Sequence, residues 1–271
     1  MSEWLKWRDA VRGVAHRAGE AIMHVYAGEF SFSRKMDDSP VTEADLAAHR
    51  VIVAGLQALT PDIPVLTEEG GLPDWSIRQR WTRYWLVDPL DGTREFIKRN
   101  GEFSVNIALI DGHQSVMGVV YAPATGLDYA GVLGVGSWRF VDGNPQSIHV
   151  RDSLGEIVTL ALSRSHLGGR EQALIDALGD PVVVRCGSAL KTCLVAEAGA
   201  DLYPRFGPTS EWDTAASQCV LEAAGGRLVD LQGARLQYNR GASVLNPSFI
   251  AYGARLPLPL AEIAAIAKAP R

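Results

Sequence analysis

Two carboxylates three residues apart, Asp88 and Asp91, directly follow an apolar run at residues 84–87 that is typical of a buried strand. Carboxylates held this close repel each other unless a cation lies between them, and a hard divalent cation with oxygen ligands is the simplest such cation. Gly92 and Thr93 come next, at a predicted helix start whose free backbone N–H groups suit an anion. The stretch therefore predicts a turn that holds a phosphate ester against magnesium, although a plain strand-to-helix connection explains the same residues about equally well.

The composition excludes several classes of protein. With 271 residues, 47% of them hydrophobic and 21% charged, the chain is long enough for two packed subdomains. Its net charge of −5 disfavours nonspecific binding to nucleic acid, and no apolar run approaches the roughly 20 residues that span a bilayer. Three cysteines without a CxxC pair argue against a zinc site or a disulfide framework. The N-terminus lacks the apolar core of a signal peptide, so we expect a cytoplasmic protein, with peripheral contact at the inner membrane left open.

Hydrophobic periodicity predicts an α+β first half and an α/β second half. The expected elements of the first half are helices at 4–25 and 42–59 and strands at 65–66, 84–87, 103–110, 115–121, 127–132 and 137–141. Those of the second half are strands at 158–162 and 182–185 and helices at 170–178 and 188–198. We place a boundary near residue 151, between an N-terminal subdomain (1–151) that carries most metal ligands and a C-terminal subdomain (152–271) that completes a shared cleft.

Three further acids stand where helices or strands are expected to begin or end. Asp45 follows Thr42 in a capping box, Glu68 follows a short strand, and Asp213 begins an apolar helix. A cap, a solvated turn and an acid favoured by the helix dipole would explain them singly. Because magnesium takes about six oxygens, several of them from water, acids from separate segments can also form one site for two or more ions.

In their order along the chain, these segments resemble the inositol monophosphatase superfamily, whose members are lithium-sensitive, magnesium-dependent phosphomonoesterases. The matching segments are Lys35, residues 39–45, Glu68 with Glu69, residues 88–93, and Trp212 with Asp213, Ala215 and Ala216. The resemblance extends from about residue 35 to residue 226. It implies a layered αβαβα sandwich of the sugar phosphatase fold, which agrees with the two-part organisation above.

Finer features are similar to one branch of the superfamily, the bacterial 3'(2'),5'-bisphosphate nucleotidases of the CysQ type. They are Glu95-Phe96, where inositol phosphatases usually have Asn-Phe, and the segments 101–103, 163–166 and 202–209. This resemblance implies removal of the 3'-phosphate from 3'-phosphoadenosine 5'-phosphate, giving AMP, in sulfate assimilation. An inositol monophosphatase or related sugar-phosphate phosphatase is the nearest alternative, and a non-catalytic metal- or nucleotide-binding regulator is the remote one.

The same resemblance implies roles for individual residues. Glu68, Asp88 and the Leu90 carbonyl match the ligands of a first Mg²⁺, and Asp88, Asp91 and Asp213 match those of a second. A third, weaker ion would lie near Glu68, held largely by water. Two ions roughly 3.5–4 Å apart can stabilise both the attacking and the leaving oxygen of a displacement.

Catalysis and substrate binding would fall to neighbouring groups. Thr93 and Asp45 match the pair that orients the attacking water, and the Gly92 and Thr93 amides would hold phosphate oxygens. The substrate-binding candidates are Lys35, Glu68, Leu90, Gly92, Thr93, Ser165, His166, Ser188, Lys191, Arg205 and Asp213. The expected partner is a small molecule rather than a nucleic acid polymer, and a homodimer stays open.

Overall fold

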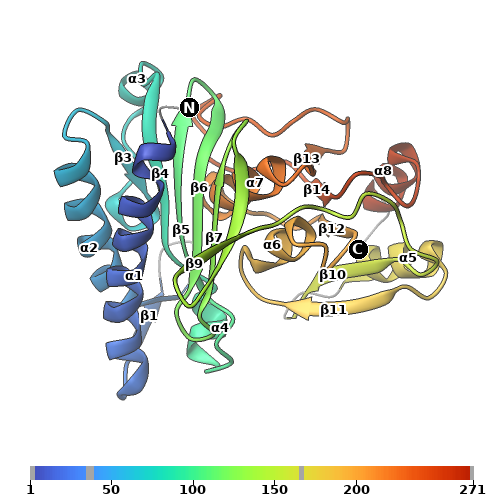
Figure 1. Cartoon of the computed structure of the whole chain (residues 1–271), viewed down its shortest axis with the longest axis horizontal. Helices are drawn as coiled ribbons and strands as arrows, with labels where there is room; N and C mark the ends of the chain where they lie inside the picture. Colours follow the sequence, from blue (N-terminus) through green and yellow to red (C-terminus); the bar gives the residue numbers. More distant parts are fainter. Residues whose placement is uncertain (1–3, 35–39, 165–167, 269–271) are drawn as a thin grey trace.

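The structure, a computed structural model, describes residues 4–34, 40–164 and 168–268. It stacks alternating layers of helices and sheets (Figure 1), in the order α1 and α2, a first sheet, α6 and α7, a second sheet, and α5 with α8. The helices are α1 (Leu5–Ala27), α2 (Glu43–Leu59), α5 (Gly169–Leu178), α6 (Leu190–Ala196), α7 (Glu211–Ala223) and α8 (Leu260–Lys268). The predicted αβαβα sandwich is confirmed.

The first sheet has the strand order β3-β4-β5-β6-β7-β8-β9. Its strands are β3 (Val65–Thr67), β4 (Arg83–Asp91), β5 (Ser104–Asp111), β6 (Gln114–Ala122), β7 (Leu127–Val132), β8 (Gly136–Val141) and β9 (Asn144–Ser147). β3 runs parallel to β4, and every later pair is antiparallel. The predicted meander is therefore confirmed. β9 escaped prediction because all of its residues are exposed, which removes the alternation that marks a half-buried strand.

The second sheet has the order β11-β10-β12-β14-β13. Its strands are β10 (Thr159–Ser163), β11 (Val182–Cys186), β12 (Leu202–Arg205), β13 (Arg227–Asp230) and β14 (Phe249–Tyr252). β10 is parallel to β11 and β12, whereas β14 is antiparallel to both of its neighbours. The connections from β10 to β11 and from β11 to β12 each contain a helix, as the predicted strand–helix alternation requires.

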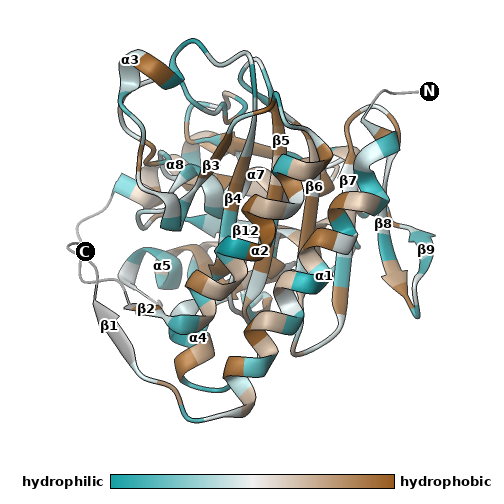
Figure 2. Cartoon of the chain, turned by 90° about the vertical axis from the view of Figure 1, so that its left-hand side faces the viewer, coloured by the Kyte–Doolittle hydropathy of each residue, from teal (hydrophilic) through white to brown (hydrophobic). Residues whose placement is uncertain are grey.

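The outer helix pair covers the first sheet with one apolar face. Val11, Val14, Ala18 and Ile22 recur at helical spacing along α1 and are buried. Figure 2 views the molecule from this side, with α1 and α2 in front of the hydrophobic strands β5 and β6. This layer closes one side of the sheet and leaves the other side for α6 and α7.

Two glycines allow α7 to lie very close to the first sheet. Gly118 of β6 and Gly131 of β7 are register partners. A Cβ added to Gly118 would lie 2.1 Å from the carbonyl oxygen of Ala216, and one added to Gly131 would lie 2.6 Å from the Cα of Val220. α7 follows residue 151 in the chain but packs on the sheet formed before it, so it joins the two halves. The subdomain boundary itself stays a prediction.

Short elements complete the described chain. They are β1 (Phe32–Arg34), β2 (Pro40–Thr42), the 3-10 turn η1 (Glu68–Gly70), α3 (Trp75–Arg78) and α4 (Thr93–Ile97). β1 and β2 form a separate antiparallel pair that leads into α2. Within the described residues, no helix has the length and apolar character needed to cross a membrane.

Candidate active site

Two of the predicted acids occupy the third position of a capped helix. The backbone N–H of Thr42 donates to Asp45 Oδ2 at 2.7 Å, and that of Ser210 donates to Asp213 Oδ2 at 2.8 Å. Both are capping boxes, in which the carboxylate accepts a hydrogen bond from the backbone of the residue that precedes the helix. The bond that begins each helix therefore also fixes where its carboxylate points.

Asp88 and Asp91 lie inside the last part of β4. The strand continues to Asp91, beyond the predicted end at residue 87, so the prediction of a turn starting at Asp88 is wrong. The pairing with β5 is irregular between Asp88 and Asp91, because Pro89 has no N–H to donate to the ladder. The Leu90 N–H instead donates to Asp88 Oδ1 at 3.0 Å. Both acids therefore lie at the same end of the strand, on either side of this irregularity.

Glu68, Asp88 and Asp213 converge from three elements. They offer carboxylate oxygens that all lie within 4.8 Å of one another. Desolvation, followed by the charge of Glu68, raises the pKa of Asp88 well above its ordinary value. Desolvation, followed by the charge of Asp91, raises the pKa of Asp213 to about 8. Crowded anionic oxygens of this kind favour a hard divalent cation, so the donor set fits magnesium.

Thr93 links the acids of β4 to α2. Its hydroxyl lies 3.2 Å from Asp45 Oδ1 and 3.4 Å from the Leu90 carbonyl oxygen. Gly92, which precedes it, has a φ of 91°, a conformation that favours glycine. Asp45 is 2% exposed, and desolvation raises its pKa against the opposing hydrogen bonds from Thr42.

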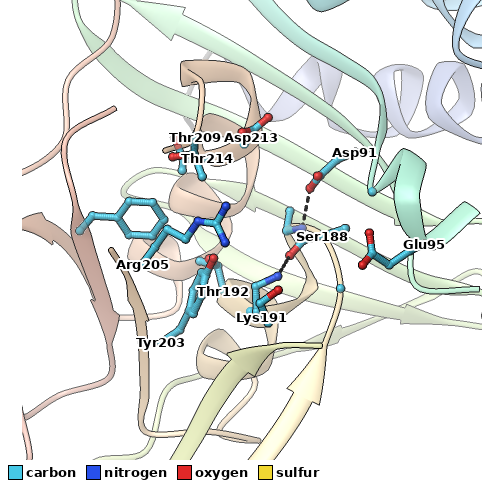
Figure 3. Close-up of a pocket in the computed structure, with 15 residues that line it drawn as sticks. Asp91, Glu95, Ser188, Lys191, Thr192, Tyr203, Arg205, Thr209, Asp213 and Thr214 are labelled. Carbon is cyan, nitrogen blue, oxygen red and sulfur yellow. Dashed lines mark hydrogen bonds between the residues drawn. The ribbon is translucent and has the colours of Figure 1, made fainter. Parts of the chain in front are cut away.

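A pocket lies beside these carboxylates: Asp213 belongs to both, and Asp91 also lines the pocket. Figure 3 shows Arg205, Tyr203 and Lys191 along one side of it and Asp91 and Glu95 facing them. The rest of the lining is Gly92, Ser163, Gly187, Ser188, Ala189, Thr192, Thr209, Thr214 and Phe249. A pocket with cationic side chains next to a metal-seeking cluster can accept a molecule that carries two phosphates.

Two cations line this pocket, Lys191 buried and Arg205 partly exposed. Lys191 is 5% exposed, and its ammonium group donates to the Ser188 carbonyl oxygen at 2.5 Å. Arg205 Nη2 donates to the Pro208 carbonyl oxygen at 3.1 Å. Among the described residues, Arg205 Nε is buried and has no hydrogen-bond partner.

The structure brings most of the predicted site residues together. Asp45, Glu68, Asp88, Leu90, Asp91, Gly92, Thr93 and Asp213 form the carboxylate end, and Ser188, Lys191 and Arg205 line the pocket or border it. Lys35, Ser165 and His166 lie outside the described residues. Their roles, like those of all these residues, stay predictions.

Sequence reasoning missed Asn106 of β5. Its side chain is 1% exposed and donates to Asp91 Oδ2 at 3.3 Å. The signal was present, because Ser104 and Asn106 are polar positions on one face of an otherwise apolar strand. That alternation predicts a buried polar pair, which requires hydrogen-bond partners.

The fold and the carboxylate cluster together define a metal-assisted phosphatase class, and comparison with known proteins agrees. The sequence profile of the Inositol monophosphatase family matches residues 3–264. The chain belongs to this family.

More specific relatives share most of the chain. It is 53% identical over 238 residues to a Salmonella typhimurium protein named 3'(2'),5'-bisphosphate nucleotidase CysQ, with 87% of this chain and 95% of that protein covered. An Escherichia coli K12 protein of the same name is 51% identical over 243 residues, 89% of this chain and 97% of that protein. Among solved structures, CysQ from Bacteroides thetaiotaomicron, described as a bacterial member of the inositol monophosphatase family, is 39% identical. The structural match covers 91% of this chain and 97% of the CysQ chain, with a TM-score of 0.79.

Proposed function

We propose that this chain is a 3'(2'),5'-bisphosphate nucleotidase that removes the 3'-phosphate of 3'-phosphoadenosine 5'-phosphate and gives AMP and phosphate. The bacterial relatives that bear this name support the choice, at 51–53% identity over most of the chain. The observation that carries it is that Asp213 belongs both to the carboxylate cluster and to a pocket lined by Lys191 and Arg205, with Asp91 in the same pocket close enough to raise the pKa of Asp213. One phosphate would meet the cluster while the other meets the cations.

The carboxylate end would hold Mg²⁺, in two or three ions. Glu68, Asp88 and the Leu90 carbonyl would bind the first ion, and Asp88, Asp91 and Asp213 would bind the second. A third ion would lie near Glu68. When bound, such ions supply positive charge to both the attacking and the leaving oxygen.

Thr93 and Asp45 would orient the attacking water. When the Thr93 hydroxyl donates to Asp45 Oδ1, 3.2 Å from its oxygen, the lone pairs of that oxygen would be available to accept a hydrogen bond from water. Desolvation raises the pKa of Asp45, which makes this carboxylate a better proton acceptor than an ordinary aspartate. The Gly92 and Thr93 amides would bind the oxygens of the scissile phosphate.

The leaving nucleoside would extend into the pocket. Lys191 and Arg205 would pair with its 5'-phosphate, because both cationic side chains line the pocket. Ser188, just before the start of α6, is expected to bind the same substrate through backbone N–H groups rather than through its hydroxyl. Lys35, Ser165 and His166 are expected to contribute from the two segments outside the described residues.

Side-by-side turnover of two substrates tests the proposal. The purified chain, with Mg²⁺ added, should release phosphate from 3'-phosphoadenosine 5'-phosphate with a higher kcat/KM than from inositol 1-phosphate. Excess EDTA should abolish both activities, and restored Mg²⁺ should return them. Faster hydrolysis of the inositol ester would favour an inositol monophosphatase instead, and no hydrolysis at any Mg²⁺ concentration would favour a non-catalytic regulator.

We expect the protein to bind this substrate in the cytoplasm. The homodimer and the contact with the inner membrane stay predictions without support from the described residues.

A further inference from the structure

A closed ring of hydrogen bonds joins the pocket turn at Ser188 to the carboxylate of Asp91. Ser188 Oγ lies 2.6 Å from Ser104 Oγ, which donates to Asn106 Oδ1 at 2.9 Å. Asn106 Nδ2 donates to Asp91 Oδ2 at 3.3 Å. The Ala189 N–H donates to the same oxygen at 2.7 Å. Because Ala189 directly follows Ser188 in the chain, this bond closes the ring.

The donors in this ring all point toward Asp91. Ser104 has one hydroxyl hydrogen, and Asn106 Oδ1 accepts it. The hydrogen between Ser188 and Ser104 must therefore come from Ser188. With its oxygen committed to Ser104, the Asn106 amide can present only its NH₂ group to Asp91. Successive donors that point one way polarise one another, and here they end on an anion.

The two members of the ring that lie on β5 are buried. Ser104 is 0% exposed and Asn106 is 1% exposed, on the face of β5 that looks toward α6 and α7. Apolar side chains at both positions would suit this layer better if only packing mattered. Because both bonds to Asp91 fall on Oδ2, its other oxygen, Oδ1, is the one left to meet a cation.

The turn that contains Ser188 is held against the first sheet by a second anchor. The Gly187 N–H donates to Glu102 Oε2 at 3.0 Å. A Cβ at position 187 would lie 2.5 Å from the Glu102 carbonyl oxygen, so only glycine fits between the two segments. Ser188 itself has a φ of 49°, an uncommon conformation for a residue with a side chain. Because these contacts fix the turn in place, its position determines where the Ala189 N–H meets Asp91.

We propose that Asn106 is a positioning residue that holds Asp91 in its metal-binding orientation, and that Ser104 couples this orientation to the pocket turn at Ser188. The proposal rests on the proposed function, because it takes Asp91 as a metal ligand. Partners of this kind, one bond away from a ligand, typically change metal affinity by 10–100-fold when removed.

Metal binding without substrate tests the proposal. Mn²⁺, which suits the same oxygen ligands as Mg²⁺, is titrated into the purified full chain and measured by electron paramagnetic resonance. Asn106→Leu, which keeps a similar volume but has no amide, should bind Mn²⁺ at least about tenfold more weakly. Ser104→Ala should weaken binding less and should also raise KM for 3'-phosphoadenosine 5'-phosphate, because Ser188 loses its partner.

Thr60→Val is the matched control. Thr60 is buried and accepts a hydrogen bond from Trp85 Nε1, on the same strand as Asp91, at 2.8 Å. Its replacement also removes a buried hydrogen bond, but the Mn²⁺ affinity and KM should stay at wild-type values. A similar loss of Mn²⁺ binding in this control would mean that any buried polar change disturbs the site, and it would overturn the specific role of Asn106.

A further variant separates this inference from the proposed function. If Asp91→Asn loses Mn²⁺ binding while folded Asn106→Leu keeps wild-type affinity, the positioning role is overturned and the metal site stands. If Asp91→Asn itself binds Mn²⁺ normally, the assignment of the ligand fails, and the inference fails with it. If Asn106→Leu does not fold, the same Mn²⁺ titration is made on Ser104→Ala. An Mn²⁺ affinity of Ser104→Ala equal to that of the wild type would then overturn the coupling between Asp91 and the turn at Ser188.

Discussion

Replacement of Gly118 by alanine should disable the site without touching any residue in it. The added Cβ would lie 2.1 Å from the Ala216 carbonyl oxygen, where an ordinary carbon–oxygen contact needs about 3.3 Å, so α7 must move by about 1.2 Å. Ala216 is one helical turn from Asp213 on α7. The carboxylate of Asp213 therefore moves with the helix.

The expected size of the effect follows from that displacement. A shift of about 1 Å in a catalytic group can lower the rate about 100-fold, so we expect kcat on 3'-phosphoadenosine 5'-phosphate to fall by about two orders of magnitude. Overpacking of this kind also lowers the free energy of unfolding by about 1–3 kcal/mol. Phosphate release and urea denaturation on the same preparation measure the two effects.

The same substitution elsewhere provides the control. A Cβ on Gly13 of α1 would meet only the Arg17 guanidinium, at 3.6 Å. Gly13→Ala should therefore keep kcat and raise the free energy of unfolding by up to about 1 kcal/mol, because alanine favours a helix. Wild-type kcat in Gly118→Ala, with unfolding free energy changed by less than about 0.5 kcal/mol, would refute the argument that α7 rests directly on the strands.

Three further predictions concern the site itself. Asp91→Asn should nearly abolish turnover while the thermal midpoint stays level or rises, because it removes one charge from a repulsive cluster; near-normal kcat would contradict its assignment. Thr93→Val should lower kcat by about 10²–10⁴-fold with little change in circular dichroism, since it removes the hydroxyl between Asp45 and water; a loss of less than tenfold would argue against that role. The third prediction concerns pH: desolvation and the charge of Asp91 raise the pKa of Asp213 to about 8 in the metal-free protein. Below that pH the protonated form predominates and a proton must leave before a cation binds, so Mn²⁺ affinity should rise as the pH approaches about 8, and a flat profile would contradict it.

Most of the site could be predicted because its acids stand at marked places in the chain. Asp45 and Asp213 follow capping residues, and Asp88 and Asp91 end an apolar run, so each was visible within a few residues of sequence. The contact between Thr93 and Asp45 was not visible in this way, because 48 residues separate them. Only the resemblance to a family placed the two together.

The position of α7 and the role of Asn106 depend on packing that local sequence patterns do not show. An apolar helix at 211–223 indicates burial, but not that α7 lies between two sheets. The position of α7 follows from Gly118 and Gly131 together, and it can be recognised only when the register that pairs their strands is known. Asn106 is similar, since its role follows from a neighbour on another strand rather than from its own surroundings in the sequence.

The capping boxes of Asp45 and Asp213 make the site sensitive to insertions in a particular way. Each acid stands three residues after its cap, and one more residue between them would turn the carboxylate by about 100° around the helix axis. The same insertion would also break the bond that starts the helix. Lengthening the chain within either cap-to-acid interval therefore removes a helix start and a candidate ligand at once, whereas lengthening an exposed loop such as the β8–β9 turn removes neither. Natural length variation among proteins with this site should accordingly be absent from both intervals and concentrated in such loops.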